Sequence, residues 1–157
     1  MTPPKPISLK QMISPATTAL NADVKDWEEA VMFAGNLLFK AGYVEQRYIQ
    51  GMINTVKELG PYAVIVPGVA LPHASPEDGA IAPSMSLITL KTPVNFGNTA
   101  NDPVKLVIAF ATIDHEAHVY ALSELAKILG DPEKVEKLKN ASRFDEVAEV
   151  IESGNKN

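Results

Sequence analysis

The sequence contains no cysteine. This absence excludes disulfide bonds, thiolate metal sites and a cysteine nucleophile from the chain. Long apolar runs are also missing, because no stretch approaches the ~20 residues that a membrane-spanning helix needs. The 14 lysines and arginines are scattered and the net charge is −5, which argues against nucleic acid as a partner. The first six residues lack the apolar core of a signal peptide, so we expect a cytoplasmic protein without direct membrane insertion.

The length and composition suit a single globular domain. The chain has 157 residues, of which 46% are hydrophobic, enough to build a substantial core. Residues 1–6 hold three prolines, and we expect loose tails at 1–6 and 153–157. No internal repeat or linker divides the sequence, so we predict one domain over 1–157.

Capping residues and apolar spacing predict five helices. They are expected over residues 26–40, 45–59, 115–129, from 131 onward and 142–151. In the third helix, the residues expected along one side are His118, Leu122, Leu125, Ala126 and Leu129. Ser142 and Asp145 are expected to cap the last helix. Residues 7–13 fit a helix or a strand equally well.

Five short apolar segments are typical of strands. They lie at 17–20, 63–66, 69–71, 84–94 and 104–111. Within 84–94 the side chains alternate, with Met85 and Leu87 on one side and Ile88 on the other. The segment 104–111 is nearly all apolar, so it should be a central strand covered on both faces. The loop between these two segments is too short for a crossover helix, which predicts an antiparallel pair.

Helices precede, separate and follow the predicted strands. This order, with one strand apolar on both faces, indicates stacked layers of helix and sheet. We therefore predict an α/β fold, a layered sandwich with a central mixed β-sheet flanked by helices on both faces.

One stretch presents a histidine on a stiffened backbone. His73 follows the segment 69–71 and lies between Pro72 and Pro76. Each proline fixes its own φ and holds the preceding residue extended. A side chain presented in this way at a strand end is well placed to react, and we interpret His73 as a phosphoryl acceptor.

The other two histidines, His115 and His118, follow the end of the segment 104–111. If the strands before His73 and His115 are neighbours, their ends converge, and we predict that His73 and His118 face each other across a small cleft. One neutral imidazole would attack phosphorus while the second donates to the phosphoryl oxygens. The nitrogen of His73 that does not react would be held by an acceptor such as a backbone carbonyl. The helix that begins near His118 would add backbone N–H donors.

Each candidate also has a simpler interpretation. His73 fits a turn residue without a role, and His118 fits a helix residue that borders the core. His115 fits a solvated loop residue. By default, Lys57 is a solvated helix charge and Ser75 is a turn hydroxyl.

A zinc site formed by the three histidines is a further alternative. Asp78 or Glu116 would supply the fourth ligand, and the spacing of His115 and His118 weakly permits such a site. No HExxH or comparable signature supports it. We therefore predict neither a metal nor a cofactor.

Residues 67–74 read Pro-Gly-Val-Ala-Leu-Pro-His-Ala. With this motif, the sequence resembles the enzyme IIA components of the bacterial phosphoenolpyruvate-dependent sugar phosphotransferase system (PTS), mannitol/fructose class (EIIA type 2). The similarity extends from Asp26 to Ile151. The stretches 57–62 and 73–79 resemble in particular the ascorbate-type branch of this family.

The resemblance implies a place for the chain in a phosphoryl relay. His73 would accept a phosphoryl group from the phosphohistidine of the carrier protein HPr, and His118 would stabilise the transferred group. The group would then pass to a cysteine of a IIB component, which phosphorylates a sugar, L-ascorbate for this branch, as it enters through the membrane IIC permease. The family fold is an α/β sandwich with a mixed sheet. The missing cysteine agrees with this scheme, because the next acceptor then lies in another protein.

The resemblance also indicates phosphate-binding candidates. Mannitol-type members usually carry an arginine where this chain has Lys57, and lysine offers a point charge in place of a bidentate fork. Lys57 and Ser75 are thus the candidate phosphate ligands. The apolar residues expected to border a docking surface for both partners are Val69, Leu71, Ala74 and Ala80. The alternative function is a regulatory, phosphorylatable module that controls partners and is not coupled to transport.

Overall fold

The computed structural model describes residues 7–153, except for the side chain of Tyr62. Its helices are α1 (Leu9–Met12), α2 (Trp27–Lys40), α3 (Gln46–Leu59), α4 (His115–Leu129), α5 (Pro132–Lys139) and α6 (Phe144–Ser153). Its strands are β1 (Thr18–Ala22), β2 (Val64–Val66), β3 (Val69–Ala70), β4 (Ser84–Val94) and β5 (Val104–Ala111). The predicted tail at 1–6 and residues 154–157 lie outside the described residues, whereas Ser153 is the last residue of α6 and not part of a tail.

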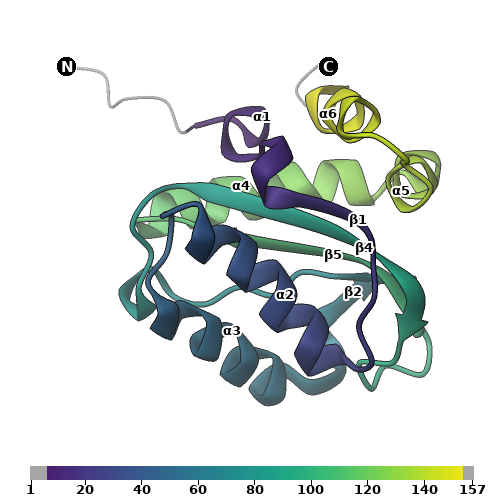
Figure 1. Cartoon of the computed structure of the whole chain (residues 1–157), viewed down its shortest axis with the longest axis horizontal. Coiled ribbons are helices and arrows are strands. Elements are labelled where there is room, and N and C mark those ends of the chain that lie inside the picture. Colours follow the sequence, from purple (N-terminus) through teal and green to yellow (C-terminus); the bar gives the residue numbers. More distant parts are fainter. Residues whose placement is uncertain (1–6, 154–157) are drawn as a thin grey trace.

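The strands form one mixed sheet in the order β1-β4-β5-β3-β2 (Figure 1). The predicted antiparallel pairing of β4 with β5 is confirmed. In contrast, β1 runs parallel to β4, and β3 runs parallel to β5. The nearly all-apolar β5 is therefore the central strand, as predicted, and β3 lies directly beside it.

Helices cover both faces of the sheet. Figure 1 shows α2 and α3 on one side, and α1, α4, α5 and α6 on the other. The strand β4 contributes to both cores, since Met85 and Leu87 pack on the α4 side while Ile88 and Leu90 pack on the α2 side. The predicted alternation along β4 and the predicted layered α/β sandwich are both confirmed.

Local signals set the bounds of the helices that frame the site. The side chain of Asp26 accepts a hydrogen bond from the N–H of Glu29 at 2.9 Å and so caps α2. Gly42, with φ of 85°, ends the turn after Lys40. Apolar residues at helical spacing then bury one face of α3, from Tyr48 to Val56.

Two details of the predicted helices are wrong. Ala126 is exposed, because it lies about 100° around α4 from the buried Leu125. The buried residues of α4 are Ala121, Glu124, Leu125, Ile128 and Leu129. Before α6, the hydroxyl of Ser142 donates to Glu146 at 2.9 Å and not to Asp145. The longer Glu146 side chain reaches back far enough to accept from the N–H of Ser142 as well.

The first strand is also displaced from its predicted position. Thr17 ends a 3₁₀ turn, and β1 continues past the expected end to Ala22. The N–H of Asn21 donates to the hydroxyl of Thr89 on β4 at 2.8 Å, which holds the strand edge together where the register shifts. Residues 7–13, which fit a helix or a strand, contain the short helix α1.

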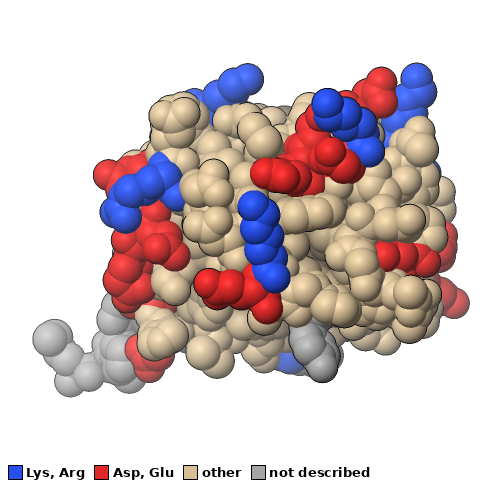
Figure 2. All heavy atoms as spheres, turned by 90° about the horizontal axis from the view of Figure 1, so that it is seen from below, with Lys and Arg blue, Asp and Glu red and all other residues tan. Residues whose placement is uncertain are grey.

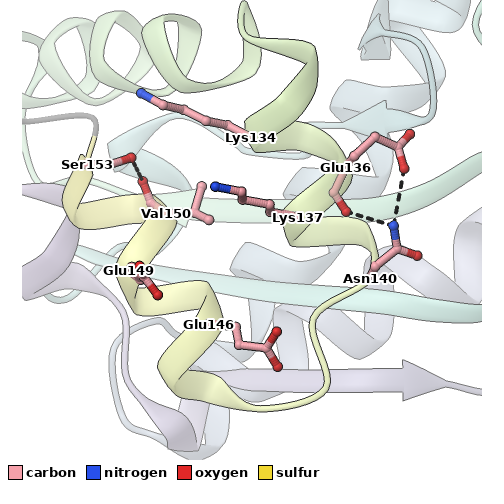
Figure 3. Close-up of a pocket in the computed structure, with 8 residues that line it drawn as sticks. All are labelled: Lys134, Glu136, Lys137, Asn140, Glu146, Glu149, Val150 and Ser153. Atoms are coloured by element: carbon pink, nitrogen blue, oxygen red, sulfur yellow. Dashed lines mark hydrogen bonds between the residues drawn. The ribbon is translucent and has the colours of Figure 1, made fainter.

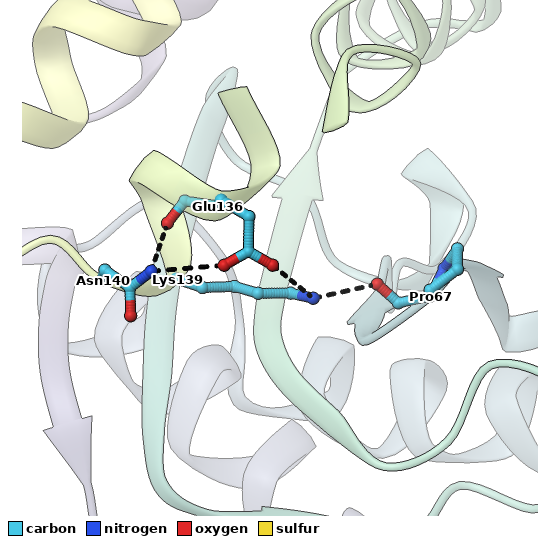
Figure 4. Close-up of polar contacts among 4 residues, drawn as sticks. All are labelled: Pro67, Glu136, Lys139 and Asn140. Carbon is cyan, nitrogen blue, oxygen red and sulfur yellow. Dashed lines mark hydrogen bonds and ion pairs between the residues drawn. The ribbon is translucent and has the colours of Figure 1, made fainter. Parts of the chain in front are cut away.

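The helix α5 is tied to the turn between β2 and β3. The Nζ of Lys139 donates to the carbonyl of Pro67 at 3.1 Å and lies 3.9 Å from Glu136 Oε1 (Figure 4). Gly68 has φ of 77°, where a side chain would be strained, and an added Cβ would also displace the lysine. The turn that leads into β3 is thereby held by a helix from the opposite end of the chain.

None of the helices within residues 7–153 combines the length and apolarity that a membrane crossing requires. Figure 2 shows the molecule from below, the side on which α2 and α3 lie in Figure 1. Basic and acidic side chains are intermingled there with uncharged residues.

Candidate functional site

The pairing of β3 with β5 determines where His73 lies. Val69 pairs with Leu106 and Ala70 with Val107, and this parallel register continues to a bridge between His73 and Phe110. As a result, the His73 ring stacks on the ring of Phe110, with centroids 4.8 Å apart and planes inclined by 29°. The predicted strand-end position of His73 is confirmed.

A backbone carbonyl orients the imidazole of His73. Its Nδ1 lies 2.9 Å from the carbonyl oxygen of Leu71. Because a carbonyl oxygen can only accept, Nδ1 must carry the proton. In the neutral ring, the lone pair is then on Nε2, which makes Nε2 the nucleophilic atom. Pro72 lies between the two partners and fixes its own φ, so the short loop that joins them has little freedom.

His118 lies beside His73, as predicted. The chain leaves β5, and Asp114 caps α4 by accepting a hydrogen bond from the N–H of Ala117 at 2.7 Å. One turn into the helix, the His118 ring lies 5.0 Å from the His73 ring and 5.3 Å from the Phe110 ring, measured between centroids. The convergence of the two strand ends therefore brings the two imidazoles together.

Both imidazoles are held in their neutral form. Burial lowers the pKa of His73 below its usual 6.5, and the hydrogen bond to Leu71 opposes this shift only in part. Burial is also the main reason that the pKa of His118 is lowered, and repulsion from the neighbouring imidazoles lowers it further. A histidine with a lowered pKa is uncharged and nucleophilic at pH 7.

A small hollow opens in front of the histidines. Its volume is about 140 Å³, and its lining residues are Thr55, His73, Ala74, Ser75, Pro76, His115 and His118. Ser75 thus lies at the position predicted for a phosphate ligand, although its role there stays a prediction. Lys57 is exposed and is not among the lining residues, so α3 presents Thr55 to the hollow instead.

Sequence reasoning missed Thr55 because the relevant signal is tertiary. Gly51 lies one turn earlier on α3, and a Cβ added there would approach Ala74 and Asp78 to 3.2 Å. This close contact brings α3 against the His73 loop. The residue one turn further on therefore faces the same loop.

Sequence reasoning also missed the contacts of Tyr48. Its hydroxyl donates to the carbonyl of Phe110 at 2.8 Å and accepts from the N–H of Ala74 at 3.2 Å. Burial raises the pKa of Tyr48 to about 12, so the hydroxyl keeps its proton. A tyrosine in an otherwise aliphatic buried stripe is the signal that could have indicated such contacts. Tyr48 thus links α3 to the residue after His73 and to the residue on which His73 stacks.

The loop after His73 is held from both sides. The N–H of Ser75 donates to Asp78 Oδ2 at 3.1 Å. Arg47, on α3, donates to the carbonyl of Glu77 at 2.9 Å and pairs with Glu45 at 2.8 Å. The loop therefore has a defined shape around the hollow.

The expected docking residues need correction. Val69, Leu71 and Ala74 are buried, because the β3 segment and the loop after it are packed on both sides. Ala80 is only partly exposed and packs against the α2–α3 core. The exposed apolar residues at this end of the sheet are Ile81, Ile113 and Val119.

A metal site and a second hollow are the alternatives to the histidine hollow. Within residues 7–153, no three His, Asp or Glu side chains are placed to hold a metal ion together, so the zinc alternative gains no support. A larger hollow of about 570 Å³ lies between α5 and α6 (Figure 3). Its lining includes both Lys137 and Glu149 but none of the histidines. The smaller hollow is thus the one of these two that the histidines line.

The chain is similar to known proteins in sequence and in structure. The family described as "Phosphoenolpyruvate-dependent sugar phosphotransferase system, EIIA 2" matches residues 11–154. The ascorbate-specific PTS system EIIA component of Escherichia coli (strain K12) is 36% identical over 137 residues, which cover 87% of this chain and 89% of that protein.

Solved structures have the same fold. The crystal structure of a putative PTS IIA (PtxA) from Streptococcus mutans superposes with a TM-score of 0.84 at 30% identity, covering 94% of this chain and 95% of that one. The Escherichia coli enzyme IIA for mannitol, solved in complex with phosphorylated enzyme IIB for mannitol, gives a TM-score of 0.80 at 29% identity. That match covers 90% of this chain and 97% of the mannitol protein.

Replacing Tyr48 by phenylalanine should destabilise the fold. The change leaves the buried N–H of Ala74 and carbonyl of Phe110 without their hydroxyl partner, at a cost of about 1–3 kcal/mol in the free energy of unfolding. Urea denaturation followed by circular dichroism measures this cost. The matched control is Tyr120→Phe on α4, which should change the midpoint little. Equal midpoints for Tyr48→Phe and the wild type would contradict the assigned contacts.

The two central histidines should titrate below pH 6.5. Their folded pKa values are lowered, so the unfolded chain binds more protons as the pH falls through its own value near 6.5. Folding stability should therefore decrease on acidification through that range, and less so in a His73→Gln variant. NMR titration of the imidazole resonances gives the midpoints directly. Midpoints of His73 and His118 at or above 6.5 would show that burial does not control their charge.

Proposed function

The chain belongs to the EIIA 2 family of the phosphoenolpyruvate-dependent sugar phosphotransferase system, and we propose that His73 is the residue that carries its phosphoryl group. Membership makes the chain a phosphotransferase component, a phosphocarrier of a sugar PTS. The observation that carries the assignment is the hydrogen bond from Nδ1 of His73 to Leu71, because it leaves the lone pair on Nε2. The neutral state of the ring at pH 7 supports the same role.

The first transfer takes the phosphoryl group from a phosphohistidine of HPr. Nε2 of His73 attacks phosphorus and forms the new N–P bond, while the old N–P bond breaks and returns its electron pair to the HPr ring. The His73 ring then carries a positive charge that the carbonyl of Leu71 stabilises through Nδ1–H. His118 donates an N–H to the phosphoryl oxygens, on which charge is spread in the transition state.

The second transfer leaves the chain. A cysteine thiolate of a IIB component attacks phosphorus, the N–P bond breaks, and His73 regains its lone pair. The chain has no cysteine of its own, which supports an acceptor in another protein. IIB then phosphorylates the sugar as it passes through the IIC permease. A related IIA has been solved together with phosphorylated IIB, which supports a direct encounter of this kind.

The branch of the family indicates the sugar. The Escherichia coli relative is named as ascorbate-specific, and its 36% identity extends over most of both chains. We therefore propose that this chain serves uptake of L-ascorbate as a single cytoplasmic domain. Ser75 at the rim of the hollow is the proposed further phosphate ligand. Lys57 would have to turn toward the hollow from the exposed side of α3 to assist.

An apolar rim offers both partners a place to dock. Ile81, Ile113 and Val119 are 56%, 54% and 62% exposed, and they lie in segments that flank the two histidines. Exposed apolar residues grouped near a reactive site mark surfaces for protein contact. A site used in turn by HPr and IIB favours interfaces of modest size that form transiently.

Labelling should require His73 and be accelerated by His118. With phosphoenolpyruvate, enzyme I and HPr, the wild type should be labelled with a phosphoryl group on one histidine. His73→Ala should not be labelled. His118→Ala should fold and become labelled on the order of 10²-fold more slowly, the cost of one donor to the phosphoryl oxygens. Full labelling of His73→Ala would refute the assignment, and an unchanged rate in His118→Ala would make His118 structural only.

A panel of purified IIB domains should identify the transport system. Labelled protein should pass its phosphoryl group faster to an ascorbate-type IIB than to a mannitol-type IIB. A IIB whose acceptor cysteine is replaced by serine is the control and should receive none. Preference for the mannitol-type domain would overturn the ascorbate assignment and leave the phosphocarrier role intact.

A further inference from the structure

The proposed function requires the hollow at His73 to hold an anion without a lysine or arginine in its wall. Among the described residues, its lining contains three histidines but neither of these cations. A phosphoryl group carries nearly two negative charges at pH 7. Besides the hydroxyls of Thr55 and Ser75, the side-chain donors in this wall are the imidazoles, and beyond the attacking ring of His73, His118 alone supplies only one.

His115 is in a position to be the second donor. It is the first residue of α4 and lines the hollow together with His118. The centroids of these two rings are 6.3 Å apart, with the planes inclined by 65°. Within residues 7–153, neither ring makes a hydrogen bond to the protein, so their N–H groups are free for a ligand. The His115 side chain is exposed and can turn toward the opening of the hollow.

The neighbouring charged groups favour such a donor. The carboxylate of Asp114 already accepts the N–H of Ala117, so this anion occupies the N-terminus of α4. Glu116 adds a second negative charge in the same turn. In the loop after His73, Asp78 accepts the N–H of Ser75. These carboxylates lie near the hollow in the sequence but are not among its lining residues, and they bring no positive charge, so the imidazoles are the side-chain donors that α4 offers to a phosphoryl group.

We propose that His115 is a second catalytic donor, which contacts the phosphoryl oxygens together with His118 during transfer and in the phosphorylated protein. This inference rests on the proposed role of His73. No bond to His115 forms or breaks, because the residue only donates an N–H to an oxygen that gains charge. Since its ring lies at the rim, His115 meets the group as it enters from one partner and leaves to the next.

Two substitutions at position 115 test this role. His115→Ala removes the donor, and His115→Gln keeps an N–H of similar reach. Glu116→Ala is the matched control, since it is exposed, lies in the same turn and is outside the lining of the hollow. Because residue 115 is exposed, thermal melting should be the same in all variants.

Three readouts follow for each variant: the single-turnover rate of labelling by phospho-HPr, the half-life of the phosphoprotein, and the ³¹P resonance of phosphohistidine 73 across pH. His115→Ala should label roughly tenfold more slowly, the value of one hydrogen bond to a charged group. Its ³¹P resonance should shift and lose part of its pH dependence. His115→Gln should recover most of the rate, and Glu116→Ala should not be slower than the wild type.

The outcomes separate this inference from the proposed function. If the wild type is not labelled at His73, the proposed function fails and the donor role of His115 fails with it. If the wild type is labelled at His73 but His115→Ala matches it in rate and ³¹P resonance, the role of His115 is refuted while the phosphocarrier function stands.

Discussion

The site depends on the hydrogen bond between Nδ1 of His73 and the carbonyl of Leu71, at 2.9 Å. This contact decides which nitrogen carries the proton and therefore which one can attack phosphorus. Its geometry depends on Pro72, which separates donor from acceptor, and on β3, which precedes both residues and lies beside the central strand β5. The parallel register with β5 then places Phe110 under the ring. The orientation, the tautomer and the charge of the His73 imidazole thus depend on how β3 pairs with β5.

Reactivity and burial are balanced around this ring. Contact with Phe110 and the sheet keeps the pKa of His73 low enough for a neutral nucleophile. The ring nevertheless lines a small hollow and stays accessible to a partner. Tyr48 connects the two requirements, because its hydroxyl fixes Ala74 and Phe110 from the core side. The helix α3 therefore supports the site from the core side through Tyr48 and borders the hollow through Thr55.

Much of the fold could be predicted, because its signals are local. The cap at Asp26, the glycine at 42 and the apolar β5 each determine their element within a few residues. The convergence of His73 and His118 followed from strand order, which obeys general rules of α/β topology.

The remaining features depend on contacts between distant segments. Thr55 reaches the hollow because Gly51 lets α3 approach the His73 loop, and no local pattern encodes that approach. Val69 and Leu71 suggested a docking surface as isolated apolar residues, but the layers on both faces bury them. By contrast, the default interpretation of Lys57 as a solvated helix charge needed only the local helical pattern, and its side chain is exposed.

The central claim is that the phosphoryl group resides on Nε2 of His73. Long-range ¹H–¹⁵N and ³¹P NMR of the uniformly ¹⁵N-labelled phosphoprotein identifies the modified nitrogen directly. The account predicts a single phosphohistidine at position 73, with phosphorus on Nε2 and a proton retained on Nδ1. Phosphorus on Nδ1 of His73, or on another residue, would contradict it.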